Sequence, residues 1–303
     1  MSAHPKILRG YEQEETLKQT LAEALTPSSM DLALRSMSEI MEMEKSEHRD
    51  INISRTLELE MRRKDGTTVW TEMKASLIRD ENQQPVGILG VTRDITERKL
   101  AEVKLKQTLD SLNNAVGATI QVMVSAIEMR DPYTAGHQIR TADLARAIAK
   151  EMGLPQEKMD GIHMAGSIHD IGKLSIPAEI LSKPTKLTDI EFSLIKEHSR
   201  SGYEMLKDVE SPWPLAQIVY QHHERMDGSG YPRNLKGDEI IMEARIMAVA
   251  DVVEAMASHR PYRPGLGIDA ALAEIEKNKG THYHNTVADA CLRLFREKGY
   301  QLK

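Results

Sequence analysis

The residues with the clearest chemical potential are His169 and Asp170, two adjacent polar residues in an otherwise apolar helical pattern. The apolar residues Ile162, Ala165 and Ile168 recur at helical spacing before the pair, which places it at the end of a helix whose other face is packed. An imidazole and a carboxylate side by side can bind one divalent ion, and the second carboxylate oxygen can bridge to another. Alone, such a pair is more often a surface or capping pair than a metal site.

Further residues of metal-ligating type follow downstream, each in a segment that is typical of a helix or a helix end. Asp251 is the most informative, because it lies inside the apolar run 246–253, and a buried charge is costly unless it is paired or bound to a metal. Five imidazoles and two carboxylates form a set large enough for two ions. The candidate ligands are His137, His169, Asp170, His198, His222, His223 and Asp251.

The segments around these residues resemble the HD-GYP subgroup of the HD-domain phosphohydrolases, over residues 131–287 and with the motifs in the same order. The matching segments are Asp-Pro-Tyr-Thr-Ala-Gly-His ending at His137, His-Asp-Ile-Gly-Lys ending at Lys173, Ile-Pro-Ala-Glu-Ile-Leu-Ser-Lys-Pro ending at Pro184, His-His-Glu-Arg-Met-Asp-Gly-Ser-Gly-Tyr-Pro ending at Pro232, and Arg-Pro-Tyr-Arg ending at Arg263. The resemblance implies a phosphodiesterase that hydrolyses cyclic di-GMP to linear pGpG, with further hydrolysis to GMP left open.

The resemblance also implies which residues are catalytic and which bind each metal ion. The implied catalytic residues are His169, Asp170 and Lys173. Two ions about 3.5–4 Å apart can share a bridging hydroxide that attacks phosphorus, and they stabilise charge on the attacking and leaving oxygens. Asp170 is expected to bridge them. We expect one ion to use His137, His169, Asp170 and Asp251, and the other to use Asp170, His198, His222 and His223.

The number and kind of ions follow less directly. Some family members bind a third ion through a glutamate where this chain has Tyr133, so two ions are expected, although Glu128 and Asp131 are carboxylates nearby. The many imidazoles favour iron or manganese, and ligand type sets such preferences only loosely. No organic cofactor is predicted.

Substrate phosphates need cations, and three residues match positions that bind phosphate in the family. They are Lys173, one helical turn past His169, and Arg260 and Arg263, whose spacing allows both to hold one phosphate. The loop 227–232 supplies Tyr231, which the resemblance places against the nucleotide. The group that protonates the leaving oxygen is not identifiable from the sequence.

The region 1–95 resembles the C-terminal half of a PAS sensor domain. After a helical segment with a helix start at Thr26-Pro27, three alternating stretches over 55–62, 69–77 and 86–92 predict an antiparallel meander. The expected front strands of a full PAS domain are missing. We therefore predict a truncated sensor or interaction segment without a bound ligand.

The region 96–129 predicts a long linker helix. Its apolar residues are spaced like a coiled-coil seam with one stutter, which indicates a parallel homodimer, and a helix packed within its own chain is the alternative. The seam residues are Leu105, Leu109, Leu112, Val116, Ile120, Met123 and Ile127.

The region 130–303 predicts an HD-type catalytic domain built as an all-helical bundle. Helical patterns occur near 138–152, 156–170, 188–206, 214–224, 240–258, 268–278 and 286–298. The predicted fold class is therefore mainly α: this bundle, preceded by the small α+β half-PAS segment and the coiled-coil-like linker. Ligand sites in such bundles are built from side chains that face the interior.

Composition sets outer limits on location and partners. With 303 residues the chain has room for about two domains. The single cysteine and the lack of an apolar run of roughly 20 residues favour a cytoplasmic protein that does not enter a membrane. A net charge of −6 argues against DNA or RNA polymers as partners but not against a small nucleotide held by metal ions.

Two alternatives to cyclic di-GMP hydrolysis stay open. Nothing in the motifs recognises a guanine edge, so another cyclic dinucleotide such as cyclic GMP-AMP is a possible substrate. A catalytically silent protein that binds a nucleotide or partner is the other. The complete ligand set argues against silence, because a chain released from catalysis would be free to lose buried charges that cost stability.

Overall fold

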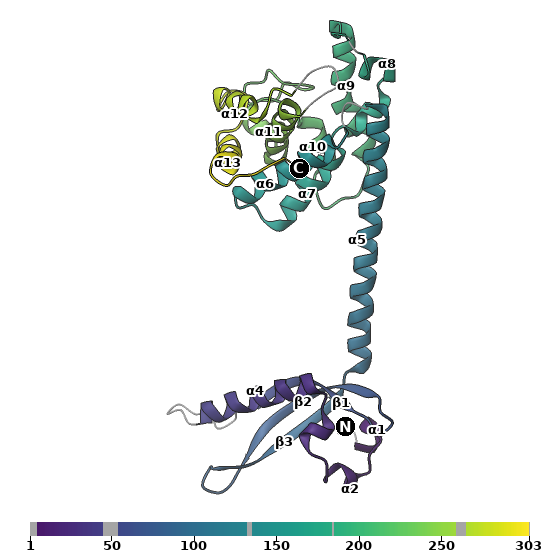
Figure 1. Ribbon diagram of the computed structural model, residues 1–303, viewed down its shortest axis with the longest axis vertical. Helices are drawn as coiled ribbons and strands as arrows, with labels where there is room; N and C mark the ends of the chain where they lie inside the picture. Colours follow the sequence, from purple (N-terminus) through teal and green to yellow (C-terminus); the bar gives the residue numbers. More distant parts are fainter. Residues whose placement is uncertain (1–4, 45–53, 132–134, 184, 259–264, 303) are drawn as a thin grey trace. The chain divides into compact units, whose positions relative to one another are not determined.

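The computed structural model describes residues 5–44, 54–131, 135–183, 185–258 and 265–302. The chain forms two compact units, Met1–Asn113 and Asn114–Lys303. A long helix, α5 (Thr96–Arg130), runs from the first unit into the second (Figure 1).

The N-terminal unit is built on an antiparallel sheet of three strands in the order β1-β2-β3 (Figure 1). The strands are β1 (Ser54–Arg62), β2 (Thr68–Arg79) and β3 (Pro85–Asp94), which confirms the predicted meander. Leu59 pairs with Thr71, and Thr71 pairs with Asp94 in the next strand. Leu59 and Val69 are fully buried, as the alternation of apolar and polar residues requires.

The sequence pattern predicts a helical segment from Tyr11 to about Asp50, and over the described residues the structure divides the region before the sheet into separate helices. They are α1 (Pro5–Arg9), α2 (Gln13–Thr16), α3 (Leu21–Ala24) and α4 (Pro27–Glu44). Helix α4 begins at Pro27, as predicted. The chain leaves the helical conformation at Leu25, whose backbone is extended and forms an isolated bridge with Met61 of β1.

Helix α5 matches the predicted linker over its whole length. Its N-terminus is fixed by Asp94, whose carboxylate accepts a hydrogen bond from the backbone of Thr96 at 2.8 Å. The middle of the helix, 100–119, is exposed. Leu105 is 61% and Leu112 is 58% exposed, so the seam from Leu105 to Val116 has no cover within the single chain that the structure describes, whereas Ile127 at its end is buried.

Among the described residues, the C-terminal unit is built of helices joined by loops, as predicted, with no β-strand. Its elements are α6 (His137–Glu151), α7 (Gln156–Ile168), the 3₁₀ helix η2 (Ile171–Ser175), α8 (Ala178–Leu181), α9 (Asp189–Leu206), α10 (Leu215–Gln221), the 3₁₀ helix η3 (Gly237–Glu239), α11 (Met242–Ala257), α12 (Ile268–Lys277) and α13 (Asn285–Arg296). Thr188 and Glu191 form a capping box at the start of α9. Over the described ranges, no helix combines the length and apolar character needed to cross a membrane.

Two apolar clusters hold this unit together. The larger joins α6, α7, α10, α11, α12 and α13 around residues such as Leu144, Ile246 and Cys291. Cys291 is buried and unpaired, as expected for a core residue, and burial raises the pKa of its thiol to about 12. The smaller cluster packs Ile127, near the C-terminal end of α5, with Ile168, Ile171, Leu206 and Val219.

Candidate metal centre

The predicted ligands come from five helices that converge in the C-terminal unit. His137 is the first residue of α6, His169 and Asp170 follow α7, and His222 and His223 follow α10. The other two lie within helices, His198 in α9 and Asp251 in α11. Six of the seven are buried and His223 is half-buried. Helix ends let several side chains approach one point without the helix axes colliding.

The structure brings all seven side chains into one cluster. They form three overlapping groups whose ligand atoms lie within 4.8 Å of one another. The groups are His198 with His222 and His223, His137 with His169 and Asp251, and His169 with Asp170 and His222. The first two groups correspond to the two halves of the predicted ligand set, and the third connects them.

Three of the imidazoles have their tautomers set by the backbone. Nδ1 of His169 lies 2.7 Å from the carbonyl oxygen of Gly166, and the corresponding distances are 2.6 Å from His198 to Ile195 and 2.6 Å from His222 to Val219. A carbonyl only accepts, so each Nδ1 carries the proton and donates. Each Nε2 therefore turns an unprotonated lone pair toward the cluster, as a metal ligand requires.

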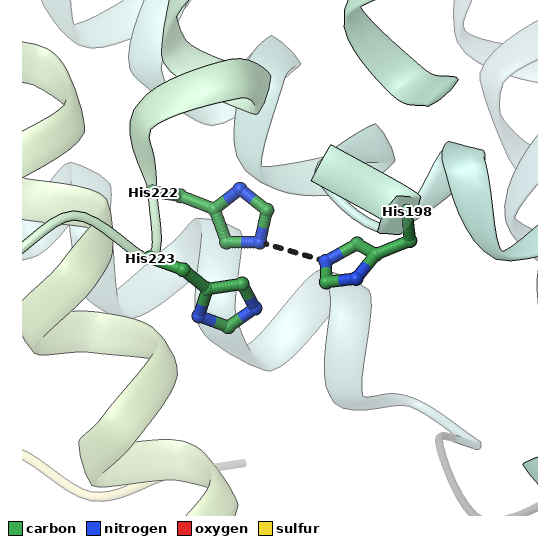
Figure 2. Close-up of side chains that lie close together, drawn as sticks. All are labelled: His198, His222 and His223. Atoms are coloured by element: carbon green, nitrogen blue, oxygen red, sulfur yellow. Dashed lines mark hydrogen bonds between the residues drawn. The ribbon is translucent and has the colours of Figure 1, made fainter. Parts of the chain in front are cut away.

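Figure 2 shows the rings of His198, His222 and His223 turned toward one another, the first from α9 and the others from the end of α10. The Nε2 atoms of His198 and His222 are 3.3 Å apart. Burial lowers the pKa of both, that of His222 to about 3, so neither Nε2 carries a proton at neutral pH. Two facing lone pairs repel each other, and a cation between them removes the repulsion.

His169 provides a second sign that the cluster fits metal ions. Its side chain is 1% exposed, and among the described residues its Nε2 has no hydrogen-bond partner. A buried polar atom without a partner costs about 1–3 kcal/mol. The nearest carboxylate oxygens belong to Asp170 at 3.6 Å and Asp251 at 3.8 Å, both suited to share an ion with this nitrogen.

His137 is held differently, between two carboxylates. Its Nε2 lies 3.2 Å from Asp251, and its Nδ1 makes a very short contact with Glu254. Burial alone would lower the pKa of His137, but the hydrogen bonds to Asp251 and Glu254 raise it to about 9. In the metal-free protein a proton therefore supplies the positive charge that a bound ion supplies in the loaded protein.

Glu254 is a positioning residue that the sequence reasoning missed. It is 1% exposed, and Arg140 and Ser258 donate hydrogen bonds to its other oxygen at 2.7 and 2.6 Å. Burial would raise the pKa of Glu254, whereas the hydrogen bond with His137 and the neighbouring charges hold it at about 2. Its three-residue spacing from Asp251 in an apolar helix is the signal that identifies it, since both face the same side.

Asp170 is fixed by two donors at one of its oxygens. Lys173 lies 2.8 Å and the amide of Gln138 lies 3.0 Å from Oδ2, while Oδ1 faces Nε2 of His198 at 3.4 Å. Burial would raise the pKa of Asp170, but Lys173 and the surrounding imidazoles hold it well below its usual range. Lys173 also contacts Asp131 at 2.9 Å, so it is shared between two buried carboxylates.

The segment after His223 is shaped to lie close to the cluster. Glu224 is buried and accepts backbone hydrogen bonds from Arg233 at 2.7 Å and Leu235 at 2.9 Å, which closes the loop. Gly230 packs so tightly that an added Cβ would lie 2.5 Å from the backbone of His223 and Glu224. This loop places the Tyr231 ring 4.6 Å from the ring of His223, beside the candidate ligands.

Two of the predicted substrate-binding residues cannot be placed. Arg260 and Arg263 lie outside the described residues, as does Tyr133. Gln138, which donates to Asp170, was not predicted, and an amide after a histidine carries no signal of its own.

Comparison with known proteins agrees with this architecture. The pattern of the HD domain matches residues 121–287, more than half of the chain, and the pattern of the PAS domain matches residues 7–97. The chain belongs to the HD-domain family, in its HD-GYP type, with a PAS domain before it. The buried histidine and aspartate clusters are consistent with the binuclear metal site of HD domains.

Several curated relatives share the HD-GYP region. The chain is 38% identical over 205 residues to the cyclic di-GMP phosphodiesterase response regulator RpfG of Xanthomonas campestris, covering 67% of this chain and 54% of that protein. It is 41% identical over 180 residues to a cyclic di-GMP phosphodiesterase of Thermotoga maritima, covering 59% and 49%. It is 38% identical over 151 residues to the 3′3′-cGAMP-specific phosphodiesterase 1 of Vibrio cholerae, covering 50% and 35%. The chain spans about half the length of the first two.

Proposed function

We propose that this protein is a metal-dependent phosphodiesterase that hydrolyses cyclic di-GMP to linear pGpG. The observation that carries the proposal is the convergence of five histidines and two aspartates, three of whose imidazoles have unprotonated Nε2 atoms directed into the cluster. Relatives named as cyclic di-GMP phosphodiesterases support the choice of substrate.

The residues proposed to hold two divalent ions are those predicted from the sequence. His137, His169, Asp170 and Asp251 hold one ion, and Asp170, His198, His222 and His223 hold the other. When bound, the ions supply Lewis acidity and lower the pKa of the attacking water. Iron or manganese is the proposed metal, because imidazole suits both.

Lys173 is proposed to act on both Asp170 and the substrate. An ammonium has three protons, and the contacts with Asp170 and Asp131 use two of them. The third remains for a phosphate oxygen beside the ions. Arg260 and Arg263 are proposed to bind phosphate as well, by their match to the family motif alone.

A second candidate substrate is 3′3′-cGAMP. Three relatives from Vibrio cholerae are named as specific for it, at 38%, 37% and 31% identity. The two substrates differ in one base, and Tyr231, whose ring lies beside His223, is proposed to contact a base. Incubation with each dinucleotide in turn, followed by chromatography of the products, distinguishes the two candidate substrates.

The organisation of the chain completes the proposal. We propose a PAS segment over 1–95, a linker over 96–129 that pairs with a second copy, and a catalytic domain over 130–303. The exposed seam of α5 supports the homodimer. A cytoplasmic location is part of the same proposal, and the single unpaired cysteine supports it.

The test is anaerobic purification, elemental analysis, and incubation with each dinucleotide followed by chromatography. About two iron or manganese ions per chain are expected, with product from the wild type and none from His169→Ala or Asp170→Ala. A chain that stays inactive on both dinucleotides after reconstitution with either metal would refute the proposal in favour of a silent binding protein.

A further inference from the structure

Lys196 is a lysine beside the candidate metal centre whose ammonium rests on two aromatic rings. Its Nζ lies 4.8 Å from the centre of the Phe192 ring and 5.4 Å from the centre of the Tyr231 ring. Phe192 lies one turn earlier on the same face of α9, and Tyr231 comes from the loop after His223. Cation–π contacts of this kind fix the position of an ammonium without neutralising it.

Unlike Lys173, Lys183 and Lys207, Lys196 has no acidic partner among the described residues. Lys183 is paired with Glu191, Lys207 with Glu204, and Lys173 with two carboxylates. Over the part of the chain that the structure describes, Lys196 forms no ion pair and no hydrogen bond, although it is half-buried. Its charge is therefore available to an anion that is not part of the protein.

The contacts of Tyr231 place this cation next to the metal centre. The Tyr231 ring lies 4.6 Å from His223 and 6.5 Å from His198, both candidate ligands. One aromatic ring thus separates Lys196 from the imidazoles. Lys173 lies among the ligands themselves, so the two lysines define an inner and an outer position for negative charge.

We propose that Lys196 binds the phosphate of a cyclic dinucleotide that is not being cleaved. This inference rests on the proposed function. A cyclic dinucleotide carries two phosphodiester groups on one rigid ring, so fixing one group at the metal centre places the other to one side. An ammonium held by two rings is preorganised for that second group, and preorganisation reduces the entropy lost on binding.

The experiment compares a substrate that has two phosphates with a substrate that has one. Steady-state kinetics are measured with cyclic di-GMP and with bis(4-nitrophenyl) phosphate, a single phosphodiester, for the wild type, Lys196→Met and Lys196→Arg. Methionine keeps the unbranched stem of the side chain up to its fourth atom and removes the charged ammonium, whereas arginine keeps a charge that can also stack on Tyr231. Lys207→Met, near the end of the same helix, is the matched control.

The expected result is a KM for cyclic di-GMP about tenfold higher in Lys196→Met, with kcat nearly unchanged and most of the loss recovered in Lys196→Arg. The ratio of kcat/KM for cyclic di-GMP to kcat/KM for the single diester should fall about tenfold in Lys196→Met and stay constant in Lys207→Met. An unchanged ratio in an active Lys196→Met enzyme overturns the inference alone. A wild type that hydrolyses neither compound overturns the proposed function, and the inference with it.

Discussion

Replacing Glu254 with glutamine should weaken metal binding without touching a proposed ligand. Glu254 accepts from Nδ1 of His137 through one oxygen and from Arg140 and Ser258 through the other. A glutamine has one acceptor and one donor end, so it cannot reproduce both contacts. The substitution changes a single charge and leaves the shape of the side chain the same.

Each orientation of the new amide has a defined cost. If its oxygen faces His137, its NH₂ group faces the guanidinium of Arg140, donor against donor. If its oxygen faces Arg140, its NH₂ group faces Nδ1 of His137 and drives the imidazole proton to Nε2, the atom 3.2 Å from Asp251. That nitrogen then has no lone pair for a metal ion.

Loss of such a partner to a ligating histidine typically costs 10–100-fold in metal affinity. The corresponding change in binding free energy is about 1.4–2.8 kcal/mol. Competition with a chelator of known affinity, read by elemental analysis at increasing chelator concentration, measures the change. We expect one of the two ions to be lost early in Glu254→Gln.

Glu243→Gln is the matched control, because it makes the same chemical change in α11 at a residue whose one ion pair among the described residues is with Lys158, at 3.1 Å. Its metal affinity should equal that of the wild type. Two ions retained by Glu254→Gln at wild-type affinity would refute the argument that Glu254 positions His137.

Three further predictions concern Gly230, His137 and Leu109. Gly230→Ala should lower turnover at least tenfold, because the added Cβ would lie 2.5 Å from the backbone of Glu224. Gly117→Ala is the control, because the space around Gly117 is open, and its turnover should equal that of the wild type. Steady-state kinetics of both variants test this prediction. The metal-free protein should lose stability as the pH rises from about 6.5 to 9, because the pKa of His137 in the folded state is raised to about 9. Protonated His137 contributes its full stabilisation below about pH 6.5, and this stabilisation is lost as the pH rises through about 9. Urea unfolding at pH 6 and pH 10 should show a loss of up to about 3 kcal/mol that is absent in His137→Gln. Leu109 lies on the seam proposed to pair with a second copy and is 50% exposed in the single chain, so Leu109→Ser should shift the mass measured by light scattering from dimer to monomer. Leu266→Ser, at an exposed residue outside the seam, should leave that mass unchanged.

Much of the candidate site was predictable because short stretches of sequence around its residues have recognisable patterns. The adjacent pair His169-Asp170 follows a helical apolar pattern, and Asp251 is a charge inside an apolar helix. The helix and strand periods were equally local, so the predicted elements agree with the structure within a few residues over most of the chain. Local patterns are set by the burial of one face, which short stretches of sequence record.

The contacts between distant segments were not predictable in the same way. Glu254 contacts His137, which lies 117 positions away in the sequence, and Lys173 contacts Asp131, which lies 42 positions away. No periodicity encodes such pairs, because they exist only once the helices have packed. The sequence analysis treated Lys173 as a phosphate-binding cation and did not anticipate that two carboxylates already share it.

The small apolar cluster at the end of α5 joins the linker helix directly to the segment that carries the candidate metal centre. Ile127 packs on Ile168 and Ile171, which flank His169 and Asp170 on either side. Arg130 adds a hydrogen bond to the carbonyl of Ile176 at 2.9 Å, just past η2. Close-packed interiors transmit displacement instead of absorbing it. Torque on this helix is therefore expected to act first on Ile168 and Ile171, and through them on the two adjacent candidate ligands.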